Sequence, residues 1–136
     1  MSPIVVDTSV TMAWCFEDET TAETEALLDL VASEGAFVPI LWTNEITNVL
    51  FVAERHRRLT EAQSTRFTSL LSQLPITVAP EWPSPSALLT VSRSHGLTSY
   101  DAAYLWLAES RGLRLATFDV QLRGACTAAG VETLPR

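Results

Sequence analysis

The chain has 136 residues and a formal net charge of −7, with 16 acidic residues, nine arginines and no lysine. Its length and its 47% hydrophobic content predict that residues 1–136 fold as a single domain. The missing lysine excludes a Walker A phosphate loop and Schiff-base catalysis, because both need a lysine amine. The acidic balance argues against broad electrostatic binding of nucleic acid, so any contact with nucleic acid is expected to be local.

Cysteine usage and hydropathy predict a soluble protein of the cytoplasm. Cys15 and Cys126 are far apart in the sequence and match no zinc or redox motif, which favours a reducing compartment. No apolar run reaches the roughly 18 residues that a membrane span needs. The N-terminus also lacks the basic segment that precedes the apolar part of a signal peptide.

Predicted strands and helices alternate along the chain. The first half contains, in order, a strand at residues 4–6, a helix cap at 7–9, a helix at 20–34, a strand at 36–38, and helices at 43–57 and 60–73. The second half contains a strand at 76–78, helices at 86–94 and 98–111, a strand at 114–117, a helix at 120–129 and an edge strand at 131–133. This alternation predicts an α/β fold with a parallel sheet of about five strands, covered by helices on both faces.

Two of the predicted strands are followed by aspartates. Asp7 comes directly after the β-branched run Ile4-Val5-Val6, and Asp119 follows the strand that ends at Thr117. Functional groups of parallel α/β sheets gather beyond the carboxyl ends of the strands, so both acids are candidates. Helix capping alone is the structural alternative for Asp119. Asp7 is harder to explain in that way, because a carboxylate beside a buried strand is costly unless it is paired or metal-bound.

Two further acids lie in the first turns of predicted helices. Glu45 follows Thr43, the expected cap of its helix, and shares a stripe with two valines one and two turns later. Asp101 follows Thr98 at the spacing of a capping box and lines up with apolar residues in the same way. A favourable interaction with the helix dipole is the structural alternative for each.

The four acids would repel one another strongly if they met at one edge of the sheet without cations. No lysine exists to neutralise them, and no arginine adjoins any of them in sequence. Divalent metal ions are the economical counter-charge, and all-oxygen ligands favour Mg²⁺ or Mn²⁺ over zinc. His56 and His95 are isolated and form no metal-binding pair. Such a carboxylate site suits hydrolysis of phosphodiester bonds by metal-activated water.

Four sequence blocks surround these acids. They are Ile-Val-Val-Asp7-Thr-Ser, Leu-Trp-Thr-Asn-Glu45-Ile-Thr-Asn-Val-Leu, Leu-Thr-Ser-Tyr-Asp101-Ala-Ala-Tyr and Leu-Ala-Thr-Phe-Asp119. In order and spacing the blocks resemble those of PIN-domain ribonucleases, and in particular the VapC-type toxins of bacterial toxin–antitoxin pairs. The resemblance extends over residues 4–134. Receiver domains and haloacid-dehalogenase-like phosphatases, which also carry an aspartate after the first strand, rely on a lysine that this chain lacks.

The resemblance implies a three-layer α/β/α PIN-like fold and a Mg²⁺- or Mn²⁺-dependent endoribonuclease. It implies a catalytic metal site that uses Asp7 and Asp101 most directly, with Glu45 and Asp119 completing the pocket and orienting water. Small hydroxyl side chains beside the acids are expected to have supporting roles; these are Thr8, Ser9 and Thr117.

The resemblance also implies a homodimer, an RNA substrate and a cognate VapB-like antitoxin whose C-terminal segment covers the acidic groove. Two alternatives remain open at this point. One is a catalytically silent PIN-like module that acts only by binding a partner. The other is a metal-dependent nuclease that acts on structured DNA.

Arginine is the only strong cation available to hold RNA. Arg55, Arg57 and Arg58 cluster at the end of a predicted helix, where a favourable interaction with the helix dipole is the structural alternative. The acidic run at residues 17–19 is expected to be a solvated segment before a helix. Four tryptophans are candidates for stacking on unpaired bases, although core or interface packing is the commoner role. They are Trp14, Trp42, Trp82 and Trp106.

Overall fold

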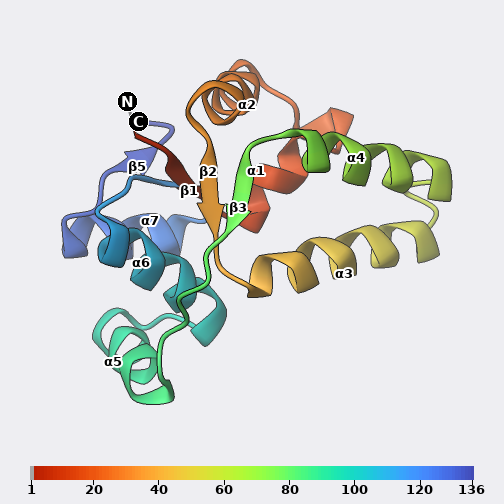
Figure 1. Ribbon diagram of the computed structural model, residues 1–136. Coiled ribbons are helices and arrows are strands. Elements are labelled where there is room, and N and C mark those ends of the chain that lie inside the picture. Colours follow the sequence, from red (N-terminus) through yellow and green to blue (C-terminus); the bar gives the residue numbers. More distant parts are fainter. Residues whose placement is uncertain (1) are drawn as a thin grey trace.

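The computed structural model describes residues 2–136, which contain a five-stranded parallel sheet between two layers of helices (Figure 1). The strand order is β3-β2-β1-β4-β5. The strands are β1 (Ile4–Val6), β2 (Ala36–Val38), β3 (Ile76–Val78), β4 (Leu115–Ala116) and β5 (Thr133–Leu134). All four strand pairings are parallel, so the predicted α/β/α architecture is confirmed.

The helices form two groups on opposite sides of the sheet. They are α1 (Thr8–Ala13), the short 3₁₀ helix η1 (Glu17–Glu19), α2 (Ala22–Glu34), α3 (Leu41–Arg55), α4 (Glu61–Gln73), α5 (Pro85–His95), α6 (Ser99–Arg111) and α7 (Val120–Ala129). In Figure 1, α1, α3 and α4 lie on one side of the sheet and α5, α6 and α7 on the other. Because the strand order reverses direction after β3, right-handed crossovers place the later helices on the opposite face.

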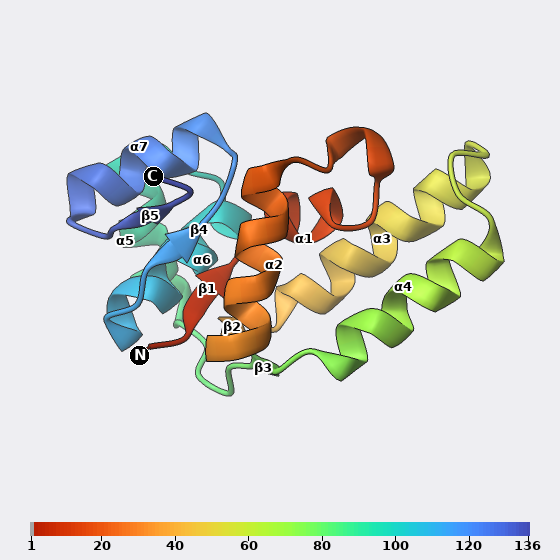
Figure 2. The ribbon, with the colours of Figure 1, turned by 90° about the horizontal axis from the view of Figure 1, so that it is seen from above.

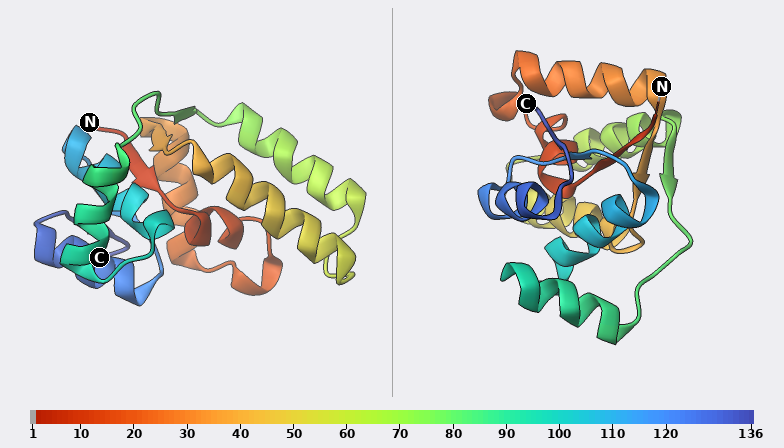
Figure 3. Two further views of the ribbon diagram at one scale, coloured as in Figure 1. Left: turned by 90° about the horizontal axis from the view of Figure 1, so that it is seen from below. Right: turned by 90° about the vertical axis from the view of Figure 1, so that its left-hand side faces the viewer.

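Helices α3 and α4 form an antiparallel pair that extends well beyond the sheet (Figures 2 and 3). The opposite layer is more compact, because α6 packs on β1 and β4 and α5 packs on α6. On α6, Leu105 and Ala108 share a stripe with Asp101, as predicted, and both are fully buried. No described helix is both long and apolar enough to cross a membrane.

Most predicted element ends agree with the structure within two residues. Thr60 caps α4 through a capping box with Gln63, and Gly96 and Gly112 end α5 and α6 in the left-handed conformation. The last strand is displaced toward the C-terminus, since it occupies Thr133–Leu134 instead of residues 131–133. The Val131 N–H donates to Cys126 O, so this residue completes the end of α7 and is not free to begin the strand.

The start of α3 was predicted wrongly. The helix begins at Leu41 and not after Thr43, because Ile40 already has helical backbone angles and the Trp42 N–H donates to Pro39 O. Glu45 therefore lies in the second turn, where an acidic side chain interacts less favourably with the helix dipole than in the first turn.

The predicted stripe beside Glu45 is also only partly buried, since Val49 is half-buried and Val52 is 40% exposed. The buried face of α3 is instead formed by Trp42, Ile46, Leu50 and Ala53. Glu45 lies at the margin of that face, which leaves its carboxylate accessible to partners from other elements.

Candidate active site

Asp7 is buried between the ends of β1 and β4. Parallel pairing of the two strands places the Asp7 N–H 3.1 Å from Ala116 O, and Thr117 Oγ1 then donates to Asp7 Oδ2 at 2.5 Å. The other carboxylate oxygen, Oδ1, accepts from Ser9 Oγ at 2.7 Å and from the Val10 N–H at 3.0 Å, so Asp7 also caps α1. The Asp7 residue is only 5% exposed.

Burial of this carboxylate is only partly compensated. Burial raises the pKa of Asp7 from 3.8 to about 6, although the hydrogen bonds from Thr117, Ser9 and Val10 each lower it. The negative charge of Asp101 raises it further. The ionised Asp7 is therefore costly in the metal-free protein, as expected for a carboxylate that lacks a cationic partner.

The loops after β1 and β4 are joined by a hydroxyl network that also places Asp119. Thr117 Oγ1 accepts from the Asp119 N–H at 3.0 Å, and Ser9 Oγ accepts from the Phe118 N–H at 3.1 Å. Asp119 Oδ1 caps α7 by accepting from the Leu122 N–H at 2.8 Å. The capping role is therefore real, but it uses only Oδ1; Oδ2 has no hydrogen-bond partner within residues 2–136.

Glu45 reaches the same region from α3. Its Oε1 accepts from Thr8 Oγ1 at 2.9 Å and from the Tyr104 hydroxyl at 2.7 Å. Burial, and then the charge of Glu45, raise the pKa of Tyr104, so its hydroxyl remains a donor at physiological pH. Tyr104 is not among the residues predicted from the sequence. The available signal was a phenol one turn after Asp101 on an otherwise apolar helix face.

Asp101 interacts electrostatically with the other three acids. Burial raises the pKa of Asp101, and the charges of Asp119 and Glu45 raise it further, while Asp101 in turn raises the pKa of Asp7. The predicted capping box is only half formed: Thr98 Oγ1 accepts from the Asp101 N–H at 3.4 Å, but no return bond from the Asp101 carboxylate is found among the described residues. The structure thus places the four predicted acids within electrostatic range of Asp101 or one another.

Replacing Asp101 by Asn should stabilise the metal-free protein, because the change removes a charge that burial and two neighbouring carboxylates disfavour. We expect a higher melting temperature than for the wild type at pH 7 in EDTA. Asp29→Asn, the same change at an exposed position on α2, serves as the control and should leave the melting temperature nearly unchanged. A lower melting temperature for Asp101→Asn would contradict electrostatic crowding.

The donor set fits a hard divalent cation. None of the ion pairs found within residues 2–136 involves any of the four acids. No three of the described His, Cys, Asp or Glu side chains are close enough to form a ready metal cage. Mg²⁺ commonly binds through only one or two carboxylates and keeps several waters, so such a cage is not required. The buried charge of Asp7 and the all-oxygen surroundings match that mode of binding.

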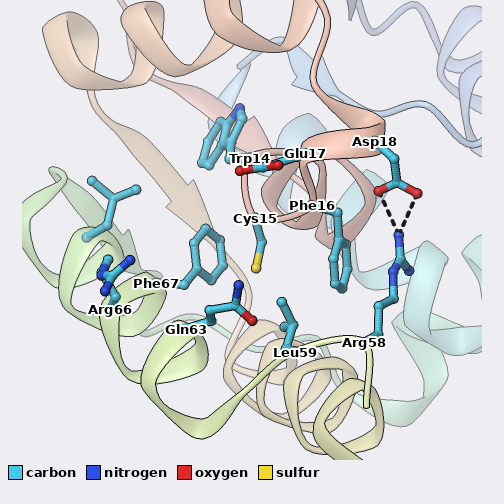
Figure 4. A pocket seen from close by; sticks show the side chains of 11 residues that line it. Trp14, Cys15, Phe16, Glu17, Asp18, Arg58, Leu59, Gln63, Arg66 and Phe67 are labelled. Atoms are coloured by element: carbon cyan, nitrogen blue, oxygen red, sulfur yellow. Dashed lines mark hydrogen bonds and ion pairs between the residues drawn. The ribbon is translucent and has the colours of Figure 1, made fainter. Parts of the chain in front are cut away.

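One arginine of the predicted cluster, Arg58, makes other contacts. Arg58 Nη2 lies 3.0 Å from Asp18 Oδ1 and 2.9 Å from Glu19 Oε2, and its guanidinium lies 3.6 Å from the centre of the Phe16 ring (Figure 4). These contacts form one wall of a pocket of about 690 Å³ that none of the four acids lines. The acidic run before α2 is therefore not simply solvated, and Arg58 is a poor candidate for holding RNA.

The tryptophans mostly have structural roles. Trp42 is buried and its Nε1–H donates to Thr11 Oγ1, while the Trp14 Nε1–H donates to Thr24 O. Of the four, Trp82 is the most exposed, at 46%. Core packing, the commoner role, accounts for the others.

Comparison with known proteins agrees with this fold. The family described as PIN domain matches residues 4–126. Among solved structures, PAE2754 from Pyrobaculum aerophilum is similar with a TM-score of 0.74 and 27% identity, over 98% of this chain and 90% of that chain. FitAcB from Neisseria gonorrhoeae is similar in fold, with a TM-score of 0.65 and 18% identity, over 96% of this chain and 95% of that chain. No curated protein sequence matches the chain.

Proposed function

Since this chain belongs to the PIN-domain family, we propose that it is a metal-dependent endoribonuclease that acts as the toxin of a type II toxin–antitoxin pair. PIN domains are generally metal-dependent nucleases, which supports hydrolysis of a phosphodiester bond. The observation that carries the proposal is a cluster of acids at the ends of β1 and β4, in which the Thr117 hydroxyl links Asp7 to Asp119 and the charge of Asp101 acts on Asp7. Two of them, Asp7 and Asp101, have pKa values raised by burial and by neighbouring acids.

In this proposal Asp7 and Asp101 bind Mg²⁺ or Mn²⁺, and Glu45 and Asp119 complete the site. When bound, the metal would lower the pKa of a coordinated water and offset charge on the phosphate. The remaining chemistry depends on how the chain positions its own groups.

Several hydroxyl groups fix the carboxylates. Thr117 and Ser9 hold the two oxygens of Asp7, and Thr8 holds Glu45. Thr117 also accepts from the backbone of Asp119, so one hydroxyl links two of the acids. These contacts agree with the supporting roles proposed for Thr8, Ser9 and Thr117, because each limits the motion of a carboxylate that would bind metal or orient water.

Cleavage assays with matched oligonucleotides test the proposal. Purified protein should cleave single-stranded RNA in the presence of Mn²⁺, and excess EDTA should abolish cleavage. Structured DNA of the same sequence should be cleaved far more slowly. Faster cleavage of the DNA would favour a DNA nuclease, and cleavage that persists in EDTA would contradict a metal mechanism.

One rival is a catalytically silent module that acts by binding a partner. Expression in a bacterial host separates the two. An endoribonuclease toxin should arrest growth, and the double variant Asp7→Asn, Asp101→Asn should not. Growth arrest that persists in the double variant would favour the silent module.

The proposal includes a VapB-like antitoxin and a homodimer. Both are supported by family resemblance, and the antitoxin's C-terminal segment would cover the acidic groove. A small upstream reading frame whose product has a DNA-binding N-terminus and co-purifies with this chain is the expected partner. Size-exclusion chromatography with light scattering should report a dimer.

A further inference from the structure

A buried phenol on α6 contacts a carboxylate on a different helix. Tyr104 is only 1% exposed, and its ring lies in the hydrophobic core. Its hydroxyl is 2.7 Å from Glu45 Oε1 and 3.1 Å from Thr8 Oγ1. Because the ring is held by the core, the position of the hydroxyl is set by the packing of α6 and not by the flexible surface.

The number of available protons determines how these three groups interact. Each hydroxyl has one proton to donate, and Glu45 Oε1 lies within hydrogen-bond distance of both hydroxyls. When Tyr104 and Thr8 both donate to Oε1, their own 3.1 Å contact has no proton left. The carboxylate is therefore held through one oxygen by two donors from α6 and α1. Within residues 2–136, Glu45 Oε2 has no hydrogen-bond partner.

Core packing alone does not explain this arrangement. A buried tyrosine usually finds a hydrogen-bond partner, and a backbone carbonyl would be enough for that purpose. Tyr104 instead pairs with an ionisable group 59 positions away in the sequence, at the predicted acidic site. Phenylalanine would fill the same space at this position without the hydroxyl.

We propose that Tyr104 is a positioning residue, which holds Glu45 through Oε1 so that Oε2 is available to a divalent metal or to its water. This role rests on the proposed function, because both involve the same metal site. It does not require that the substrate be RNA, because it concerns how the carboxylate is presented. Hydrogen bonds of this kind to metal-site carboxylates typically change metal affinity about 10- to 100-fold.

The test is calorimetric titration of Mn²⁺ into the full chain without nucleic acid. Tyr104→Phe keeps the ring and removes the hydroxyl, and we expect the Kd for Mn²⁺ to rise about tenfold. Tyr100→Phe is the matched control, since Tyr100 lies on the same helix but is 61% exposed. It should bind Mn²⁺ as the wild type does. In a Glu45→Gln background, adding Tyr104→Phe should change the Kd less than about twofold, because the two residues act through one contact.

The outcomes separate this role from the proposed function. If Tyr104→Phe lowers the melting temperature but binds Mn²⁺ like Tyr100→Phe, the tyrosine is structural and the positioning role is wrong. The positioning role would also be wrong if Tyr104→Phe raised the Kd for Mn²⁺ equally in the Glu45→Gln background. It would be wrong too if the wild type bound no Mn²⁺. If the wild type binds Mn²⁺ and Tyr104→Phe weakens binding, the positioning role stands even where no RNA is cleaved. In that case the proposed function alone fails.

Discussion

Replacing Asp7 by Asn should reduce Mn²⁺-dependent RNA cleavage by more than about a hundredfold, the upper range for residues that act only through a metal ligand. Asp7 is the most buried of the four acids, and each of its oxygens is oriented by a hydroxyl. Asn is nearly the same size and keeps one acceptor oxygen, but it supplies no charge to hold a divalent cation. Initial cleavage rates at several Mn²⁺ concentrations measure the loss.

Asp29→Asn is the matched control for this experiment, because it makes the same chemical change at an exposed position on α2. It should cleave RNA at the wild-type rate. Circular dichroism and melting curves establish that both variants are folded. An Asp7→Asn protein that is folded and retains most of its cleavage activity would contradict the proposed role of Asp7.

In EDTA, the wild type should lose stability relative to Asp7→Asn as the pH rises from about 4 to above 6. The pKa of Asp7 is about 6 in the folded chain against 3.8 ordinarily, so between these values the folded state binds more protons than the unfolded state. The free energy of unfolding therefore falls with rising pH in this window. The difference of about two pH units corresponds to roughly 3 kcal/mol, or a shift of roughly 10 °C in melting temperature.

Melting curves of the two proteins at pH 4, 5, 6 and 7.5 test this expectation. Subtracting the Asp7→Asn values removes the contributions of the other acids, which titrate in both proteins. Saturating Mn²⁺ at pH 7.5 should restore the lost stability of the wild type and have a much smaller effect on Asp7→Asn. If the difference in stability between the wild type and Asp7→Asn does not change between pH 4 and 7.5, the burial of Asp7 is compensated without metal.

The order and type of the elements follow from local patterns. The fully buried run at residues 4–6 is β-branched, and glycine and threonine mark several helix ends where a cap or a left-handed residue is needed. Prediction was poorer at α3, where no side-chain cap marks the start of the helix. There the chain enters the helix directly after β2 through Ile40, and the nearest capping residue, Thr43, is two positions too late.

The candidate site was also only partly predictable from the sequence. Asp7, Asp119, Asp101 and Glu45 could be identified from the sequence, because each follows a strand or lies near a helix start, and parallel strands bring such positions to one edge. That the charges of these acids act on one another follows only from the packing of α3 and α6 beside β1 and β4.

Which groups hold the carboxylates, and which arginines are available, was decided by the tertiary structure. The contact between Tyr104 and Glu45 joins residues 59 positions apart, and the contact between Thr117 and Asp7 joins residues 110 positions apart. Arg58 is likewise committed to acids some 40 positions earlier. Hydrogen bonds and ion pairs require atoms to be placed to within a few tenths of an ångström, and residue type and spacing do not encode such precision. The sequence therefore determined which acidic groups are candidates for the site, and the packing of the helices determined how they are held.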